Sequence, residues 1–247
     1  LEKSLNLTDV LTRIQEPYHL KLSEASKESG GTKTIHEQFK TKEAGLENLL
    51  VYDRHNKASF RTYLFKNFEI QSLKTLSAEA HPVTEKGYEW SYKSISDCSK
   101  LSLIQKDASY QCIKELHLKK NSILSSLEVD IENDYRYLGV EWNFNLFAPD
   151  ADNRYILIDG AHKKPLNFSG IFSDFTKLSM IDEWYGIEIN FDTQNFKHLV
   201  IEPIYTISLS ESGVEKTFQG TSILLLGTIE NGKFAGKTNI TIQTIGK

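Results

Sequence analysis

Alternation of apolar and polar residues is the feature of this chain that most constrains its fold. In the run from 140 to 147, apolar Trp142, Phe144 and Leu146 alternate with Glu141 and two asparagines. Successive side chains of a β-strand point to opposite faces of its sheet, so this period of two predicts a strand with one apolar face.

About a dozen runs of this kind follow one another, separated by short polar turns and without a helical pattern between them. They cover residues 49–52, 59–65, 88–94, 100–105, 110–118, 123–130, 139–147, 154–159, 186–191, 199–209, 218–226 and 237–244. Strands without intervening helices predict an all-β, antiparallel architecture, and two packed sheets are favoured over a closed barrel. A chain of 247 residues is long enough to bury a large core.

Three glycine-bearing segments are expected to reverse the chain with a positive backbone angle. They are residues 211–213, 231–232 and 169–170. None precedes a helix, which disfavours a phosphate-binding loop.

The N-terminal part follows a different pattern. Apolar residues spaced by three and four predict a helix over 5–14, which Pro17 is expected to end. The polar, glycine-containing segment 23–34 is typical of a linker. The predicted division is therefore a helical arm and linker over 1–34 and a β-sandwich domain over 35–247.

Charge and hydropathy exclude two classes of partner. The net charge is −4, which argues against a nucleic-acid surface because such surfaces carry basic stripes. No apolar run approaches the roughly 20 residues of a membrane span, so no membrane partner is expected and a cytoplasmic location is predicted.

The two cysteines, Cys98 and Cys112, fall on two runs joined by a turn. A hairpin could bring them together. Free thiols in a reducing compartment are favoured over a cross-strand disulfide, and two cysteines cannot fill a zinc site.

Asp182, Glu183 and Trp184 permit two interpretations. The indole ring could stack on a sugar while carboxylates hold its hydroxyl groups. Alternatively, Asp182 bonds the backbone of a turn and Trp184 lies in the core. On a strand, Asp182 and Trp184 would share a face and Glu183 would not, which disfavours a catalytic pair made from the two acids.

Five other residues are candidates for binding or domain contacts. Tyr52, Asp53 and Arg54 form either a salt-linked corner or a surface for another domain. His198 either bonds a sugar hydroxyl or plays a structural role. Glu202 lies in an apolar strand, where a carboxylate is paired with Arg or Lys or faces a groove.

Cofactor motifs are absent from the sequence. No His-Glu-x-x-His or Gly-x-Ser-x-Gly pattern occurs. The loop with Asp150 and Asp152 offers oxygen ligands to Ca²⁺, although a solvated turn is the favoured interpretation. We therefore expect no cofactor.

Two separated blocks carry a resemblance to a known family. Residues 42–60 read Lys-Glu-Ala-Gly-Leu-Glu-Asn-Leu-Leu-Val-Tyr-Asp-Arg-His-Asn-Lys-Ala-Ser-Phe, and residues 182–191 read Asp-Glu-Trp-Tyr-Gly-Ile-Glu-Ile-Asn-Phe. In this order they resemble the C-terminal β-sandwich of glycoside hydrolase family 57, the α-amylase and 4-α-glucanotransferase group. Tyr52, Asp53, Ser59 and Phe60 match the family pattern. Thr62 and Tyr63 stand where the family has Asp-His, so a polar site built on that pair is not expected here.

The resemblance implies a galactose-mutarotase-like supersandwich that packs on a (β/α)₇ barrel holding the catalytic Glu and Asp. No position of this chain matches the barrel motifs, so no catalytic residue is assigned. The implied role is a non-catalytic accessory domain, with an α-glucan or oligosaccharide and the missing N-terminal barrel as partners. Two alternatives remain: a sugar epimerase using His162, His198, Glu141 and Glu202, and a structural domain without sugar contact.

Overall fold

The structure, a computed structural model, describes residues 12–25, 41–53, 57–66, 81–82, 87–132, 134–211 and 213–246. Within these ranges, one helix, one 3₁₀ helix and fifteen strands form the fold. The strands are β1 (Arg61–Phe65), β2 (His81–Pro82), β3 (Glu89–Ile95), β4 (Cys98–Lys106), β5 (Tyr110–Lys119), β6 (Ser122–Ile131), β7 (Tyr137–Phe144), β8 (Arg154–Ile158), β9 (His162–Pro165), β10 (Gly170–Ser173), β11 (Lys177–Asp182), β12 (Ile187–Gln194), β13 (His198–Ser210), β14 (Gly213–Thr228) and β15 (Lys233–Thr244).

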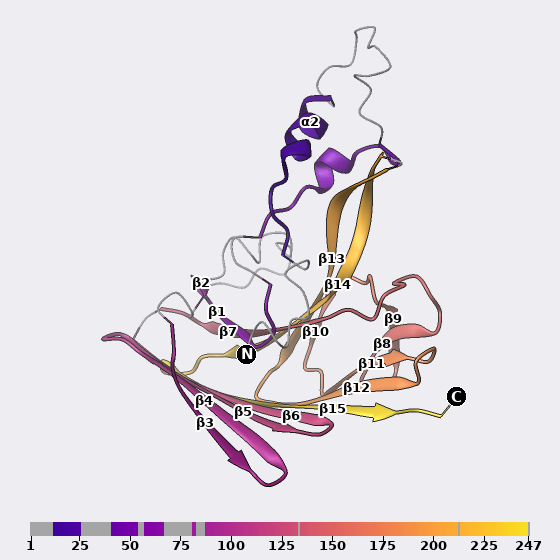
Figure 1. The fold of residues 1–247 in the computed structure, drawn as a ribbon. Helices are drawn as coiled ribbons and strands as arrows, with labels where there is room; N and C mark the ends of the chain where they lie inside the picture. Colours follow the sequence, from indigo (N-terminus) through magenta and orange to yellow (C-terminus); the bar gives the residue numbers. More distant parts are fainter. Residues whose placement is uncertain are drawn as a thin grey trace, which may run out of the picture.

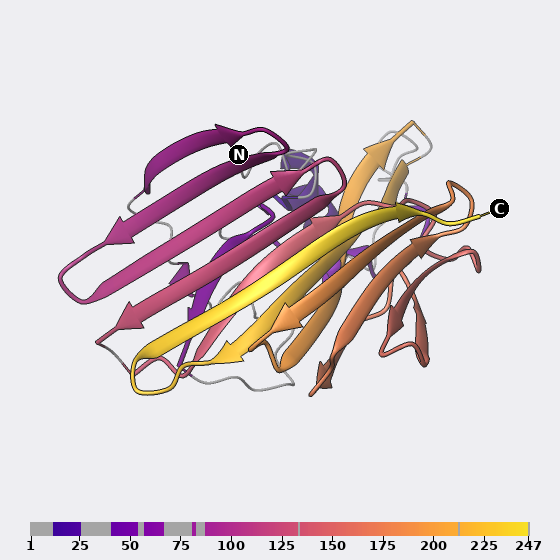
Figure 2. The ribbon, with the colours of Figure 1, turned by 90° about the horizontal axis from the view of Figure 1, so that it is seen from below.

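Two antiparallel sheets make up the fold (Figure 1). In the described part of the chain, six strands form one sheet in the order β10-β13-β14-β7-β1-β2, and nine form the other in the order β3-β4-β5-β6-β15-β12-β11-β8-β9. The predicted antiparallel two-sheet sandwich is therefore confirmed. Seen from below, the large sheet is a broad twisted surface with β15, in yellow, crossing its middle (Figure 2).

The main hydrophobic core fills the space between the two sheets. Phe144 of β7 meets Phe191 of β12 edge to face, with ring centroids 5.4 Å apart, so side chains of the two sheets interdigitate. Trp142 stacks on Phe60 at 5.3 Å, and both are 1% exposed. The alternation in β7 thus directs its aromatic residues to the core as predicted.

The β13–β14 hairpin projects beyond the sandwich and carries the helical segments at its tip (Figure 1). Helix α2 (Pro17–Ala25) and the 3₁₀ helix η2 (Leu46–Leu49) pack there in a separate small core. This core consists of Leu22, Leu46, Ile207 and Val214. The N-terminal segment therefore lies on the hairpin rather than on a face of the sandwich.

Local predictions for the N-terminal part fail in part. Most of the helix predicted over 5–14 lies outside the described residues, and residues 12–14 are not helical. Pro17 begins α2 instead of ending a helix, which suits proline because its missing N–H has no partner in a first turn. Residues 49–52 form no strand, since Leu49 is the last residue of η2 and residues 50–52 are irregular.

Two of the three predicted glycine turns are confirmed. Gly213 has a φ of 124°, and Asn231 and Gly232 have φ values of 51° and 76° in the β14–β15 turn. The prediction for Gly170 is wrong, because this residue begins strand β10 and does not have a positive φ.

The two cysteines are free thiols. They do lie on one hairpin, but Cys112 pairs with Gln105 at one end of β4 while Cys98 begins that strand at the other end. The register of the hairpin therefore separates the two sulfur atoms.

Candidate functional site

Charged side chains gather on the face of the six-stranded sheet that points away from the core. Val140 and Trp142 of β7 belong to the main core, so Glu141 between them points to the opposite face. Ser222 of β14 and Glu202 of β13 lie opposite each other on that face. With Lys57, Arg13 and Asp53, the two glutamates form what we call the charge cluster.

Glu141 is the most completely bonded member of the charge cluster. Its side chain is 4% exposed and lies 2.7 Å from Nζ of Lys57, whose side chain is 12% exposed. The Tyr63 hydroxyl donates to Oε2 at 2.6 Å, and the Ser222 hydroxyl donates to Oε1 at 2.9 Å. Burial alone would raise the pKa of Glu141, but the attraction of Lys57 and these hydrogen bonds outweigh it and lower that pKa.

Glu202 shows the opposite behaviour. Burial raises its pKa, and this effect outweighs the attraction of Lys57 and Arg13, while Glu141 and Asp53 reinforce the rise. Lys57 and Arg13 thus attract this carboxylate without lowering its pKa. The two glutamates have pKa values shifted in opposite directions, yet Glu141 is fully engaged and not accessible as a catalytic acid or base.

The raised pKa of Glu202 predicts a pH-dependent effect of the Glu202→Gln variant. A carboxyl group with a higher pKa in the folded state contributes stability below its ordinary pKa of 4.5 and loses it as the pH rises through the folded value. We therefore expect the variant to have a higher Tm than the parent at about pH 8. At about pH 4 the two Tm values should agree. An equal or lower Tm at the higher pH would contradict the prediction.

Asp53 forms an ion pair with Arg13, a partner outside the corner that the sequence proposed. Its side chain is 2% exposed, and its two oxygens lie 2.6 Å and 3.1 Å from Nη2 and Nε of Arg13. Arg13 also donates its backbone N–H to Asp53, and the Asp53 N–H donates to the Arg13 carbonyl. Tyr52 is 38% exposed and its hydroxyl lies 3.3 Å from Nδ1 of His19. Arg54 lies outside the described residues.

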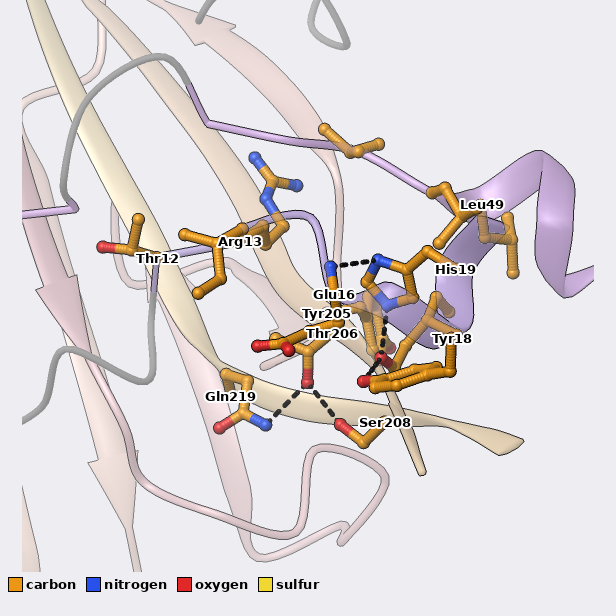
Figure 3. A pocket seen from close by; sticks show the side chains of 14 residues that line it. Thr12, Arg13, Glu16, Tyr18, His19, Leu49, Tyr205, Thr206, Ser208 and Gln219 are labelled. Carbon is orange, nitrogen blue, oxygen red and sulfur yellow. Dashed lines mark hydrogen bonds between the residues drawn. The ribbon is translucent and has the colours of Figure 1, made fainter. Parts of the chain in front are cut away.

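A pocket of about 350 Å³ lies between the N-terminal segment and the β13–β14 hairpin (Figure 3). The polar groups that line it are largely bonded to one another. His19 accepts from the Glu16 N–H at Nδ1, and Nε2 lies 3.1 Å from the carbonyl of Ile207. Gln219 and Thr206 are joined at 2.8 Å. The polar groups of the pocket therefore hold the N-terminal segment on the hairpin and are not free for a reaction.

Asp182 ends strand β11, and Glu183 and Trp184 lie in the turn between β11 and β12. Asp182 is 1% exposed, accepts the Tyr185 N–H at 2.9 Å and lies 3.0 Å from Nε of Arg154. The expectation that it bonds a turn is confirmed. The expectation that Trp184 lies in the core is wrong, because its side chain is 65% exposed. Residues 177–182 form strand β11, so Trp184 lies after a strand and not within one.

The four residues of the epimerase alternative do not surround one sugar-sized space. His198 and Glu202 share a face of β13, but buried Val200 stands between them. His198 bonds the Ser173 hydroxyl at 3.0 Å. His162 is on β9 in the other sheet. Glu141 is engaged within the charge cluster.

Neither a metal centre nor a membrane-spanning helix is found in the described ranges. No group of three His, Cys, Asp or Glu side chains there could hold a metal ion. Asp150 instead accepts from the Asn167 amide at 2.6 Å, and the Asp152 carbonyl accepts from Lys163. No helix in the same ranges is long and apolar enough to cross a membrane.

Sequence reasoning missed four members or supports of the site: Arg13, Lys57, Tyr63 and Ser222. Arg13 and Lys57 lie outside the strands, and nothing in their local sequence indicates burial. Tyr63 and Ser222 could have been found from the sequence. Like Glu141, each is a polar or amphipathic residue at an alternate position of a buried strand.

The comparisons with known proteins point to one family. Residues 1–240 match the family described as α-amylase/4-α-glucanotransferase, C-terminal. The chain is 32% identical over 236 residues to α-amylase 1 of Dictyoglomus thermophilum, and the match covers 90% of this chain. It spans only 33% of that relative's length.

Among solved structures, the fold is similar to 4-α-glucanotransferase from Thermococcus litoralis. The TM-score is 0.53 at 18% identity, over 78% of this chain and 28% of that one. A putative aldose 1-epimerase from Escherichia coli K12 gives a TM-score of 0.48 at 12% identity, over 76% of this chain and 81% of that one. The first likeness supports a shared fold.

Proposed function

Because the chain belongs to the family of α-amylase/4-α-glucanotransferase C-terminal domains, we propose that it is the non-catalytic accessory domain of an enzyme that acts on α-glucans. The observation that carries this proposal is the family match over residues 1–240. The chain spans 33% of the length of an α-amylase. In such a protein, the remainder of the sequence would supply the catalytic groups.

The geometry of the acidic residues supports a non-catalytic role. Glycoside hydrolysis by two carboxylates needs both groups free to face one sugar. Glu141 is closed off by Lys57, Tyr63 and Ser222. Asp53 and Asp182 are each buried against an arginine. These contacts support our proposal that the catalytic groups belong to another domain, for which a barrel is the proposed partner.

The contacts of Arg13 suggest how the domain would hold a preceding one. The bidentate ion pair between Arg13 and Asp53 is partly shielded from water, and charge-assisted pairs of this kind are geometrically specific. It fixes the backbone of the N-terminal segment against residues 50–53. We propose that this connection sets the orientation of the chain that leads to the catalytic domain.

Activity measurements test the proposed role. The 247-residue chain and the full-length product of its gene are assayed separately with soluble starch and maltoheptaose. We expect the full-length product to hydrolyse or rearrange these glucans and the 247-residue chain to give no turnover.

Either of two results would overturn the proposal. Turnover by the 247-residue chain alone would show that it is catalytic. A folded full-length product that is inactive on every α-glucan tested would remove the assignment to an α-glucan-acting enzyme.

A further inference from the structure

The turn between β11 and β12 presents two aromatic rings to solvent. Trp184 is 65% exposed and Tyr185 is 62% exposed. Large aromatic side chains dominate burial energies, so two exposed neighbours in one turn are an unfavourable arrangement unless they meet a ligand or partner.

The backbone of this turn is held in place from several sides. The buried carboxylate of Asp182 bonds the Tyr185 N–H and pairs with Arg154. The Glu183 N–H donates to the carbonyl of Asn153 at 2.9 Å. Gly186 has a φ of 67°, and its carbonyl accepts from Ile245. The rings are therefore displayed on a fixed support, which lowers the entropic cost of binding.

Hydrogen-bonding groups surround the rings. The Tyr155 hydroxyl donates to Glu183 at 3.0 Å, and both residues are accessible at the surface. The Arg154 guanidinium lies 5.6 Å from the centre of the Tyr185 ring, and Nζ of Lys163 lies 3.8 Å from that of Tyr155. The edge of the aromatic patch therefore carries hydrogen-bond donors and acceptors beside the two rings.

This combination matches the chemistry of a sugar. A pyranose has an apolar C–H face that stacks on an aromatic ring, and its hydroxyl groups bond carboxylates and phenols at the edge. We propose that Trp184, with Glu183, Tyr155 and Tyr185, forms a surface site that binds an α-glucan chain apart from the catalytic centre. The site rests on the proposed function for the class of its ligand, and it gives the domain a task of its own.

A matched control is available in the same chain. Trp90 on the edge strand β3 is 71% exposed, and Tyr92 on the same face is 55% exposed. The Tyr92 hydroxyl bonds Ser99 of the neighbouring strand β4. In the described part of the chain, β4 is the only strand that pairs with β3. Trp90 thus offers an exposed indole on an edge strand instead of on a turn fixed by a buried carboxylate.

The test uses the 247-residue chain in native gels containing amylose, with retardation as the measure of affinity. We expect Trp184→Ala to weaken binding about tenfold or more, which corresponds to about 1.4 kcal/mol. Trp184→Phe should recover part of the affinity because it restores a stacking face. Trp90→Ala should bind as the parent does, and the Tm values of all variants should agree.

The outcomes separate this inference from the proposed function. Equal retardation of parent and Trp184→Ala chains, or a complete lack of retardation of the parent, overturns the surface site. If the full-length product still acts on starch in that case, the proposed function stands without it. A loss of binding in Trp90→Ala with Trp184→Ala unaffected also overturns the site, because it places the glucan on β3.

Discussion

Replacing Trp142 by alanine is expected to destabilise the chain by about 3–5 kcal/mol, the usual cost of removing a large buried aromatic side chain. Trp142 is 1% exposed and stacks on Phe60. It belongs to β7, one of the two middle strands of the six-stranded sheet. Its removal leaves a cavity between the two sheets that the rigid strands cannot close. Urea unfolding followed by circular dichroism measures the loss.

Trp142→Phe is the control for this prediction. The buried indole N–H of Trp142 has no hydrogen-bond partner in the described structure, so phenylalanine loses no such bond and keeps most of the ring. We expect a cost below about 1.5 kcal/mol. If Trp142→Ala were as mild as Trp142→Phe, the core position assigned to Trp142 would be wrong.

Lys57→Met is expected to cost about 3–5 kcal/mol at neutral pH, because it leaves the Glu141 carboxylate buried without its cation. Tyr63 and Ser222 still donate hydrogen bonds, but neither neutralises the charge. The double variant Lys57→Met, Glu141→Met should recover much of the loss, since an apolar pair of similar volume often replaces a buried ion pair without net cost. Thermal and urea unfolding of the two single variants and the double variant measure the coupling.

The pH dependence supplies a second check on the ion pair. The pKa of Glu141 is lowered in the folded parent by Lys57 and the hydrogen bonds against the effect of burial. Its contribution to stability is therefore present above the ordinary value of 4.5 and is lost as the pH falls through the folded value. The destabilisation caused by Lys57→Met should shrink under acidic conditions. A double variant no more stable than Lys57→Met would show that the buried charge is not the cause.

The β architecture could be predicted from the sequence because the alternation of apolar and polar residues is a local signal. It assigned Trp142 and Phe144 to one face of β7 and Glu141 to the other, and the structure agrees. Alternation does not tell what covers a face. The polar face of β7 is in fact covered, because Glu141 and Asn143 are 3% and 5% exposed.

The charge cluster was harder to predict from the sequence, because the residues that pair in it are distant from one another along the chain. Arg13 and Asp53 are 40 positions apart, and Lys57 and Glu141 are 84 apart. Trp184 was misplaced for a local reason. The run 177–182 mixes Lys and Ser with three apolar residues, so strand β11 was not recognised and the turn after it was taken as part of a strand.

The position of β15 has a consequence for biosynthesis. This strand, the last in sequence of those described, lies in the middle of the nine-stranded sheet, between β6 and β12. Ribosomes synthesise about 5–20 residues per second, so both neighbouring strands emerge well before residues 233–244. Until then each neighbour presents an open edge to other chains in the cell. The domain can therefore complete its fold only after those residues leave the exit tunnel, and a truncation before Lys233 would leave two unconnected half-sheets.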